Sequence, residues 1–388
     1  MPRSVVFAAL TAFVLMLGIG VLFPVLPFLT RDLGIPDAQA GWLLASYPLA
    51  SFLASPLWGR FSNARGRKPA LVIGLVGYSL GFILFGFGQT LGQLLAARVL
   101  GGLLSAAALP ALFAYIADVT SPEKRSSGMG ALGAGLGLGV TLGPVLGWLT
   151  YAAYGLRAPY FVAGAIGLAN ALVVSRWLPE SLDAAARADR DREAAPRRPL
   201  AQIALPLAPF LLCSFLTSTA RMAVDTTFGF FAQTALGASP RGVAGVLFAM
   251  GVTSALVQGG LLRSLAGRIS DLQLFVAGCA LMTAGLAGLG FAGSWAGVLA
   301  GGIPVAVGFA LLAPTLTSLL SRAAEDVQGE AQGLNGSATA LSRVISPLLF
   351  TSGLWPSFGG PGTYGAAAVL SALALVVALL RFRSRVAA

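Results

Sequence analysis

The sequence predicts an all-α membrane protein with twelve transmembrane helices arranged as two pseudo-symmetric six-helix bundles. Its composition is the first reason: of 388 residues, 56% are apolar and 10% are charged, and the mean hydropathy is +0.83. A soluble domain carries about 25% charged residues. The second reason is a set of uncharged runs that reach the roughly 20 residues needed to cross a bilayer. The third is a charged central segment, residues 179–200, that divides the predicted helices into two sets of six.

The individual helices follow from the uncharged runs and from the breakers inside the longest ones. The run 272–321 holds no charged residue, and as one helix it would be about 75 Å long against about 30 Å of hydrocarbon. Glycine, proline and polar residues at 89–93, 290–294 and 356–362 supply the necessary turns. We expect the first span to be retained rather than cleaved as a signal peptide. The expected spans are 4–29, 39–60, 69–88, 92–117, 126–153, 158–178, 203–233, 241–262, 272–290, 295–321, 330–354 and 363–380.

The basic residues predict the orientation of these spans. With a cytoplasmic amino terminus, only Arg31, Arg157 and Arg241 fall outside, and three more arginines fall within spans. Because basic residues concentrate on the cytoplasmic side, we expect a cytoplasmic (inner) membrane protein with both termini in the cytoplasm. The net charge of +11 then reports topology, and we expect no nucleic-acid partner. The nineteen cytoplasmic basic residues are Arg3, Arg60, Arg65, Arg67, Lys68, Lys124, Arg125, Arg176, Arg187, Arg190, Arg192, Arg197, Arg198, Arg263, Arg268, Arg322, Arg381, Arg383 and Arg385.

The central charged segment defines the domain organisation. We expect an N-terminal bundle over 1–180, a cytoplasmic linker over 181–202 and a C-terminal bundle over 203–388. The linker is predicted to be a solvated tether, with a surface helix as the alternative. A weak self-similarity at an offset of 204 residues, such as Gly41 with Gly245 and Leu57 with Leu261, indicates that each bundle repeats one unit.

The sequence contains few residues of the types that catalysis or metal binding requires. The chain has no histidine, and Cys213 and Cys279 are isolated within apolar segments, so we expect no metal site and no catalytic residues. A membrane-embedded enzyme would require a nucleophile with a base, or a set of metal ligands. The sequence therefore predicts that the protein is not an enzyme.

A glycine-rich basic segment joins the second and third spans. It reads GRFSNARGRK from Gly59 to Lys68 and resembles the G-x-L-x-D-R-x-G-R-K/R signature of the major facilitator superfamily. In that family the glycines permit a tight turn and the basic residues engage helix ends and acidic groups, here Asp118. Asn63 stands where the family has an acid, and can still cap a helix. The gate motif comprises Gly59, Asn63, Arg65, Gly66, Arg67, Lys68 and Asp118.

The fifth span carries glycines at intervals of four residues. Its sequence GVTLGPVLG resembles the G-x-x-x-G-P-x-x-G signature of antiporters in the same superfamily. Such a glycine face lets another helix approach closely, and we expect that helix to be the eighth span. A proline within the motif weakens the backbone. The motif residues are Gly135, Gly139, Gly143, Pro144 and Gly147.

Together these segments resemble the twelve-span drug:proton antiporters, of the tetracycline-exporter-like or multidrug efflux branch. The resemblance implies a monomer in the lipid bilayer that exports small amphipathic or drug-like molecules by alternating access. It also implies that the proton gradient supplies the energy and that no cofactor is bound. Leu15 lies where the tetracycline exporters carry an aspartate. The alternative is therefore a lipid, glycolipid or other solute transporter of the same fold with no or atypical proton coupling.

Apart from Arg60, Arg176, Arg241 and Glu330 at the span ends, four charged residues fall inside the predicted spans: Arg98, Arg221, Asp225 and Arg343. Charge in a membrane is costly, so each is a functional candidate. Arg98 matches a fourth-span arginine that the resemblance associates with proton coupling. Asp225 is the only acid among the four; we expect it to take up a proton and thereby release Arg221 or Arg98. A static pair of Arg221 with Asp225 is the alternative, and Arg343 is a candidate for attracting an anionic group or for pairing with Asp225.

The resemblance also indicates which spans line the substrate cavity. Polar, aromatic and adaptable side chains on those spans are the candidates for substrate contact. They are Tyr47, Phe113, Met222, Phe228, Phe248, Gln258 and Asn335.

Overall fold

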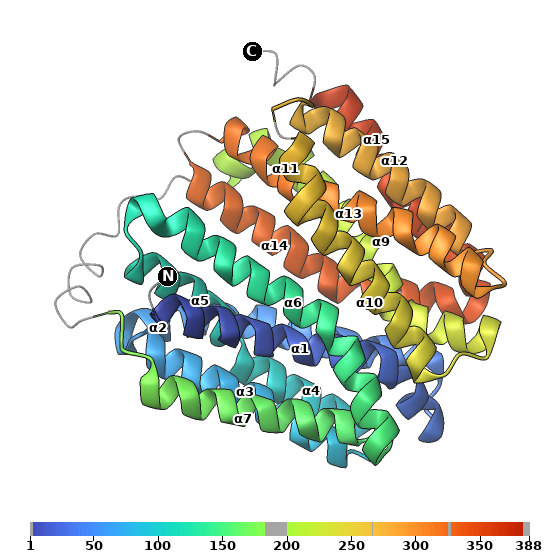
Figure 1. Cartoon of the computed structure of the whole chain (residues 1–388), viewed down its shortest axis with the longest axis horizontal. Coiled ribbons are helices and arrows are strands. Elements are labelled where there is room, and N and C mark those ends of the chain that lie inside the picture. Colours follow the sequence, from blue (N-terminus) through green and yellow to red (C-terminus); the bar gives the residue numbers. More distant parts are fainter. Residues whose placement is uncertain (1–2, 183–199, 266, 325–326, 383–388) are drawn as a thin grey trace. The chain divides into compact units, whose positions relative to one another are not determined.

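The computed structural model describes residues 3–182, 200–265, 267–324 and 327–382. Within these ranges the regular secondary structure is helical and contains no strand (Figure 1). Ten of the described helical stretches are long and apolar enough to cross a membrane. The predicted fold class, an all-α membrane protein, is therefore confirmed.

The number of predicted spans is recovered when two features are taken into account. The last of the ten stretches, Gln328–Arg381, has 54 residues, about 80 Å as one helix. Gly359 interrupts it with φ 55° and ψ −153°. In addition, α2 (Asp37–Arg65) has 29 residues and exceeds the required length, although it is less apolar than the ten. The expected turn at 356–362 is therefore a kink within a helix rather than a loop.

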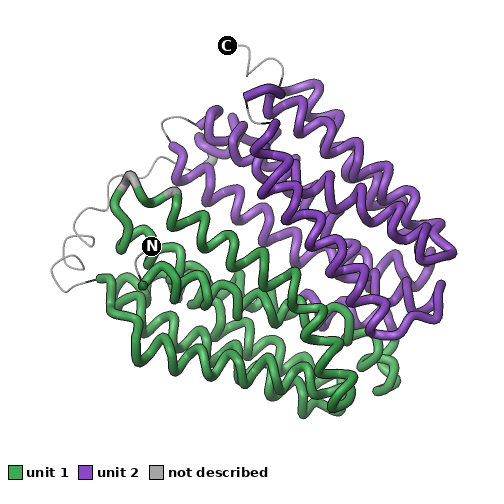
Figure 2. The backbone as a smooth tube through the Cα atoms, in the orientation of Figure 1, with its two compact units in different colours: residues 1–36, 46–195 green, residues 37–45, 196–388 purple. Residues whose placement is uncertain are grey.

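The described helices fall into two compact units (Figure 2). Unit 1 comprises residues 1–36 and 46–195, and unit 2 comprises residues 37–45 and 196–388, so the first nine residues of α2 group with unit 2. The predicted domain limits of 1–180 and 203–388 stay predictions, and most of the predicted linker, 183–199, lies outside the described residues, as do the basic residues within it and at 383–388.

Unit 1 is built on α1, which packs along α6 and contacts α3 and α7. The Tyr78 hydroxyl of α3 donates a 3.0 Å hydrogen bond to the Val14 carbonyl of α1. The fourth predicted span consists of two helices that meet at residues 106–107. Besides α2, the unit contains α1 (Arg3–Asp32), α3 (Arg67–Phe87), α4 (Leu91–Ser105), α5 (Ala108–Val119), α6 (Pro122–Tyr154) and α7 (Ala158–Trp177).

In unit 2, α9 packs against α14 and α15, and α12 packs against α13 and α15. Two of its spans contain π-helical turns, η1 and η2, a feature that is frequent at functional sites. The elements are α9 (Leu200–Leu236), α10 (Pro240–Leu256), η1 (Val257–Leu261), α11 (Leu262–Leu265), α12 (Asp271–Leu289), α13 (Trp295–Ala323), α14 (Gln328–Ser346), η2 (Pro347–Leu354) and α15 (Trp355–Arg381).

Candidate functional site

Arg67 is the centre of a buried polar network at the junction of α2 and α3. Its Nε atom lies 3.2 Å from Asp118 Oδ2, and both side chains are less than a tenth exposed. Its Nη1 atom donates hydrogen bonds to Ser62 Oγ at 2.9 Å and to Asn63 Oδ1 at 2.7 Å. One guanidinium therefore joins the end of α2, the start of α3 and the end of α5.

Glu180, which follows α7, completes this network. Its carboxylate accepts hydrogen bonds from the backbone N–H groups of Arg67 at 2.8 Å and Lys68 at 3.1 Å. The same carboxylate accepts from the N–H groups of Ser181 and Leu182. The contacts with Arg67 and Lys68 satisfy N–H groups that lack a partner at the start of a helix, and they place negative charge where the dipole of α3 favours it.

Three expectations about the gate motif are corrected. The tight turn is made by Gly66, with φ 107°, whereas Gly59 lies inside α2. The cap of α3 is Glu180, while Asn63 accepts its hydrogen bond from the Arg67 guanidinium. Of the basic residues expected near Asp118, Arg67 makes the ion pair; Arg65 is exposed and Lys68 is half-buried. Glu180 was missed, although it is the first acid after the sixth span.

Unit 2 carries a related ion pair with the charges reversed. Asp271 lies 204 residues after Arg67, and Arg322 lies 204 residues after Asp118. This is the offset at which the two halves of the sequence resemble each other. Arg322 Nη2 lies 3.2 Å from Asp271 Oδ2. Ser318 Oγ donates a 2.7 Å hydrogen bond to the same carboxylate oxygen. Asp271 begins α12 and Arg322 lies in the last turn of α13, so each charge is favoured by its helix dipole.

Because the Arg67–Asp118 pair is buried and the Asp271–Arg322 pair is more exposed, we expect breaking the first to lower the stability of the protein more than breaking the second. In Asp118→Asn the Arg67 guanidinium keeps its charge while buried, and breaking a buried pair typically costs about 3–5 kcal/mol. In Asp271→Asn the partner Arg322 is 68% exposed, and an exposed pair is worth about 0–1 kcal/mol. Thermal unfolding of the purified variants in detergent is expected to show a much lower melting temperature for Asp118→Asn only. Equal shifts in both variants would contradict this difference.

The glycine face of α6 packs against α1. A Cβ atom added at Gly135 or Gly139 would collide with the backbone carbonyl oxygens of Ala9 or Phe13, and at Gly143 it would lie 2.6 Å from the Gly20 Cα atom. At Gly147 the nearest atoms are those of Val21, also on α1. The glycines therefore permit the close approach that their spacing predicts. Their neighbour is α1, so the expectation that they contact the eighth span is wrong.

Arg221 and Asp225 form an ion pair within α9. Arg221 Nη1 lies 2.6 Å from Asp225 Oδ1, with side-chain exposures of 14% and 19%. Their i, i+4 spacing places both on one helical face. The Arg221 guanidinium carbon also lies 5.7 Å from the ring centroid of Phe309 on α13, a cation–π contact. Phe309 was missed because an aromatic residue in an apolar span gives no distinctive sequence signal.

Arg98 lies in a second polar cluster, within unit 1. Its guanidinium carbon is 4.6 Å from the ring centroid of Tyr47 on α2. The Tyr47 hydroxyl is 2.5 Å from Ser105 Oγ, and the three residues connect α2 with α4. The structure thus brings together Arg98, predicted for proton coupling, and Tyr47, predicted for the substrate cavity.

The remaining candidates occupy several environments. Phe228 is fully buried, with its ring centroid 6.5 Å from that of Phe231, whereas Phe113 is 43% exposed. Gln258 is exposed within η1. Asn335 is half-buried, and its Oδ1 atom has no hydrogen-bond partner among the described residues. Met222 and Phe248 are half-buried and Arg343 is exposed. Their roles in substrate contact stay predictions.

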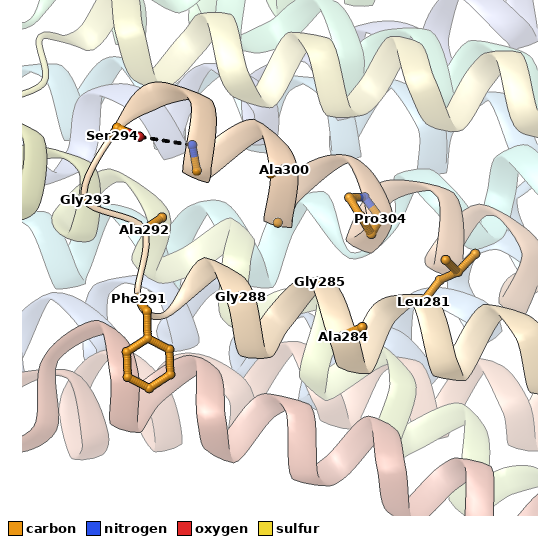
Figure 3. Close-up of a pocket in the computed structure, with 12 residues that line it drawn as sticks. Leu281, Ala284, Gly285, Gly288, Phe291, Ala292, Gly293, Ser294, Ala300 and Pro304 are labelled. Atoms are coloured by element: carbon orange, nitrogen blue, oxygen red, sulfur yellow. Dashed lines mark hydrogen bonds between the residues drawn. The ribbon is translucent and has the colours of Figure 1, made fainter.

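A pocket of about 540 Å³ lies between α12 and α13 (Figure 3). Small residues such as Gly285, Gly288 and Ala300 form much of its lining, together with Phe291 and Ser294. Ser294 Oγ accepts a 3.2 Å hydrogen bond from the Gly297 N–H, which caps α13. None of the predicted cavity residues lines this pocket, and its lining carries no charged side chain.

The fold and these sites define a class of protein. The described helices form a multi-pass membrane protein whose charged residues pair within and between helices. Paired charges within predicted membrane spans are typical of membrane transporters.

The chain belongs to the Major Facilitator Superfamily, whose sequence model matches residues 8–347. It is 29% identical over 348 residues to Multidrug resistance protein 2 of Bacillus subtilis (strain 168), covering 87% of this chain and 85% of that protein. It is 26% identical over 352 residues to Quinolone resistance protein NorA of Staphylococcus aureus, covering 90% and 89%. The family and the transporter class predicted from the motifs are confirmed.

Solved structures show the same fold at lower identity. The human organic anion transporter MFSD10 (TETRAN) matches with a TM-score of 0.73 and 21% identity, over 97% of this chain and 100% of that one. A bacterial homologue of the human lysosomal transporter Spinster, in an inward-facing and occupied conformation, matches with a TM-score of 0.77 and 15% identity, over 98% and 96%.

Proposed function

We propose that the protein exports small amphipathic, drug-like molecules across the cytoplasmic membrane by alternating access, in antiport with protons. The observation that carries the export function is the similarity to Multidrug resistance protein 2 over 87% of this chain. The proposal places both termini in the cytoplasm, as the basic residues predict. It also treats the protein as a monomer that needs no bound cofactor.

Asp225 is the proposed proton acceptor. A proton-driven transporter needs a group that gains and loses charge within the spans, and Asp225 is the only acid in the predicted spans apart from Glu330 at the end of one of them. Its 2.6 Å contact with Arg221 gives protonation a direct consequence, because a neutral Asp225 releases the guanidinium. Arg221 would then be free to change partners when the transporter changes state. Arg98 is proposed to contribute from its place beside Tyr47.

The function is tested by efflux of a panel of drugs and dyes from bacterial cells that lack their own pumps. Cells expressing the protein are expected to accumulate less of at least one lipophilic compound than cells with an empty vector. Addition of an uncoupler should restore accumulation, because it collapses the proton gradient. Export that persists with the uncoupler would exclude proton coupling and leave a transporter with another mode of coupling. No export of any compound would contradict the proposed function.

A further inference from the structure

Helix α14 presents a polar face in the middle of a membrane protein. Gln332, Asn335, Thr339 and Arg343 follow one another at i, i+3, i+7 and i+11, and therefore share one face of the helix. Three of them are half-buried and Arg343 is exposed. A mid-span arginine facing hydrocarbon is strongly unfavourable, so this face requires water or polar groups beside it.

Space is available beside this polar face. A Cβ atom added at Gly329, Gly333 or Gly336 would meet no atom within 4 Å. Leu341 is the only large apolar side chain among the exposed residues of α14. By contrast, the exposed side chains of α7 include Leu168, Leu172 and Trp177, as suits a face toward lipid. The open face of α14 is therefore suited to line an aqueous path.

One edge of this polar face is held against α9. Ser346, which follows Arg343 at i+3, donates a 3.1 Å hydrogen bond from its Oγ to the Thr219 carbonyl, and Ser342, which follows Thr339 at i+3, is buried. α9 also carries Asp225, whose carboxylate is engaged by Arg221 at 2.6 Å. Away from the span ends, the predicted spans contain three arginines and this one acid, so their formal charge there is positive.

We propose that the polar face of α14 binds the negatively charged group of the transported molecule, with Arg343 as the residue that selects anionic over cationic substrates. This inference rests on the proposed export function and specifies its substrate class as anionic amphipathic compounds. A carboxylate or sulfonate matches the guanidinium, which donates two parallel hydrogen bonds to such a group. Asn335 and Gln332 supply amide groups for the polar atoms around the charge. Apolar parts of the substrate lie against the rest of the span.

The test compares two fluorescent probes of opposite charge, carboxyfluorescein and rhodamine 6G. Binding to the purified protein is measured by fluorescence anisotropy, and efflux is measured in proteoliposomes. We expect the wild type to prefer carboxyfluorescein and Arg343→Gln to weaken its binding about tenfold or more. Arg343→Lys should keep part of the preference, because it retains the charge but loses the paired hydrogen bonds. Arg176→Gln, which removes an exposed arginine at the end of α7, should leave the preference unchanged.

The outcomes separate this inference from the proposed function. A wild-type preference for rhodamine 6G would overturn the anion selectivity, and anion binding that survives Arg343→Gln would overturn the role of Arg343; either result leaves export intact. Anion binding that depends on Arg343 without any efflux would support the site and contradict the export function. Loss of binding counts only for variants that elute as a monodisperse peak and retain the wild-type melting temperature. If Arg343→Gln fails that criterion, the change in preference in Arg343→Lys decides the question.

Discussion

Asp225→Asn is expected to lower both the thermal stability and the proton-driven transport of the protein. The substitution removes the negative charge 2.6 Å from Arg221 and leaves the guanidinium charged within a predicted membrane span. Loss of one partner from a buried pair typically costs about 3–5 kcal/mol. The cation–π contact with Phe309 remains but replaces little of that energy. A lower melting temperature in detergent and slower uptake of substrate into inverted vesicles driven by a pH gradient are the expected measurements.

The double variant Arg221→Gln/Asp225→Asn separates the two roles of the pair. Because no charge remains uncompensated, its melting temperature should return close to that of the wild type. Transport driven by a pH gradient should stay absent, since no group titrates at this place. If the double variant instead transports with full dependence on the pH gradient, Asp225 is not the proton acceptor and the pair is structural. Asp32→Asn, which neutralises an exposed acid at the end of α1, serves as the matched control.

Gly143→Ala is expected to destabilise the protein more than a small substitution normally does. The added Cβ atom would lie 2.6 Å from the Gly20 Cα atom and 2.6 Å from the Leu17 carbonyl oxygen. These are backbone atoms, so relief requires α1 and α6 to separate. Overpacking of a tight contact costs about 1–3 kcal/mol. The expected result is a melting temperature several degrees lower and a reduced yield of monodisperse protein.

Gly137→Ala is the matched control for this substitution. Gly137 lies on the same helix, and a Cβ atom added there meets nothing within 4 Å. Alanine is favoured over glycine in a helix by up to about 1 kcal/mol, so this variant should equal or exceed the wild type in stability. Similar melting temperatures for Gly143→Ala and Gly137→Ala would show that the α1–α6 contact does not require glycine.

Several parts of the site were predictable from sequence because their signal is local. Charged residues within apolar runs identify Arg221 and Asp225 directly, and their spacing of four predicts the contact that the structure contains. The spacing of Gly135, Gly139 and Gly143 likewise predicts a face of close helix contact. Such patterns are fixed by helix geometry, which depends on the sequence of one helix alone.

Other contacts of the candidate site could not be predicted from the sequence, because they depend on which helices are neighbours in the fold. The glycine face of α6 contacts α1. The spacing of residues within either helix does not indicate that these two helices are neighbours. Glu180 caps α3 across 113 residues of chain, and Phe309 reaches Arg221 from α13. Asn63 retains a polar contact with Arg67 in place of the acid expected by the motif. These contacts arise from tertiary packing between helices with similar apolar surfaces.

The sequence by itself determined the class of the protein: too few charges for a soluble fold, the helical spans, their division in two, and the short set of charged residues within them. It did so because the cost of placing charge in hydrocarbon is large and acts on each residue separately. Only the tertiary structure decided which residues contact each other. Examples are Glu180, which caps the start of α3, and the Asp271–Arg322 ion pair, whose acidic and basic residues are exchanged relative to the Arg67–Asp118 pair. Apolar helices differ little in their affinity for one another, so small residues and hydrogen bonds, formed only when helices meet, select the arrangement.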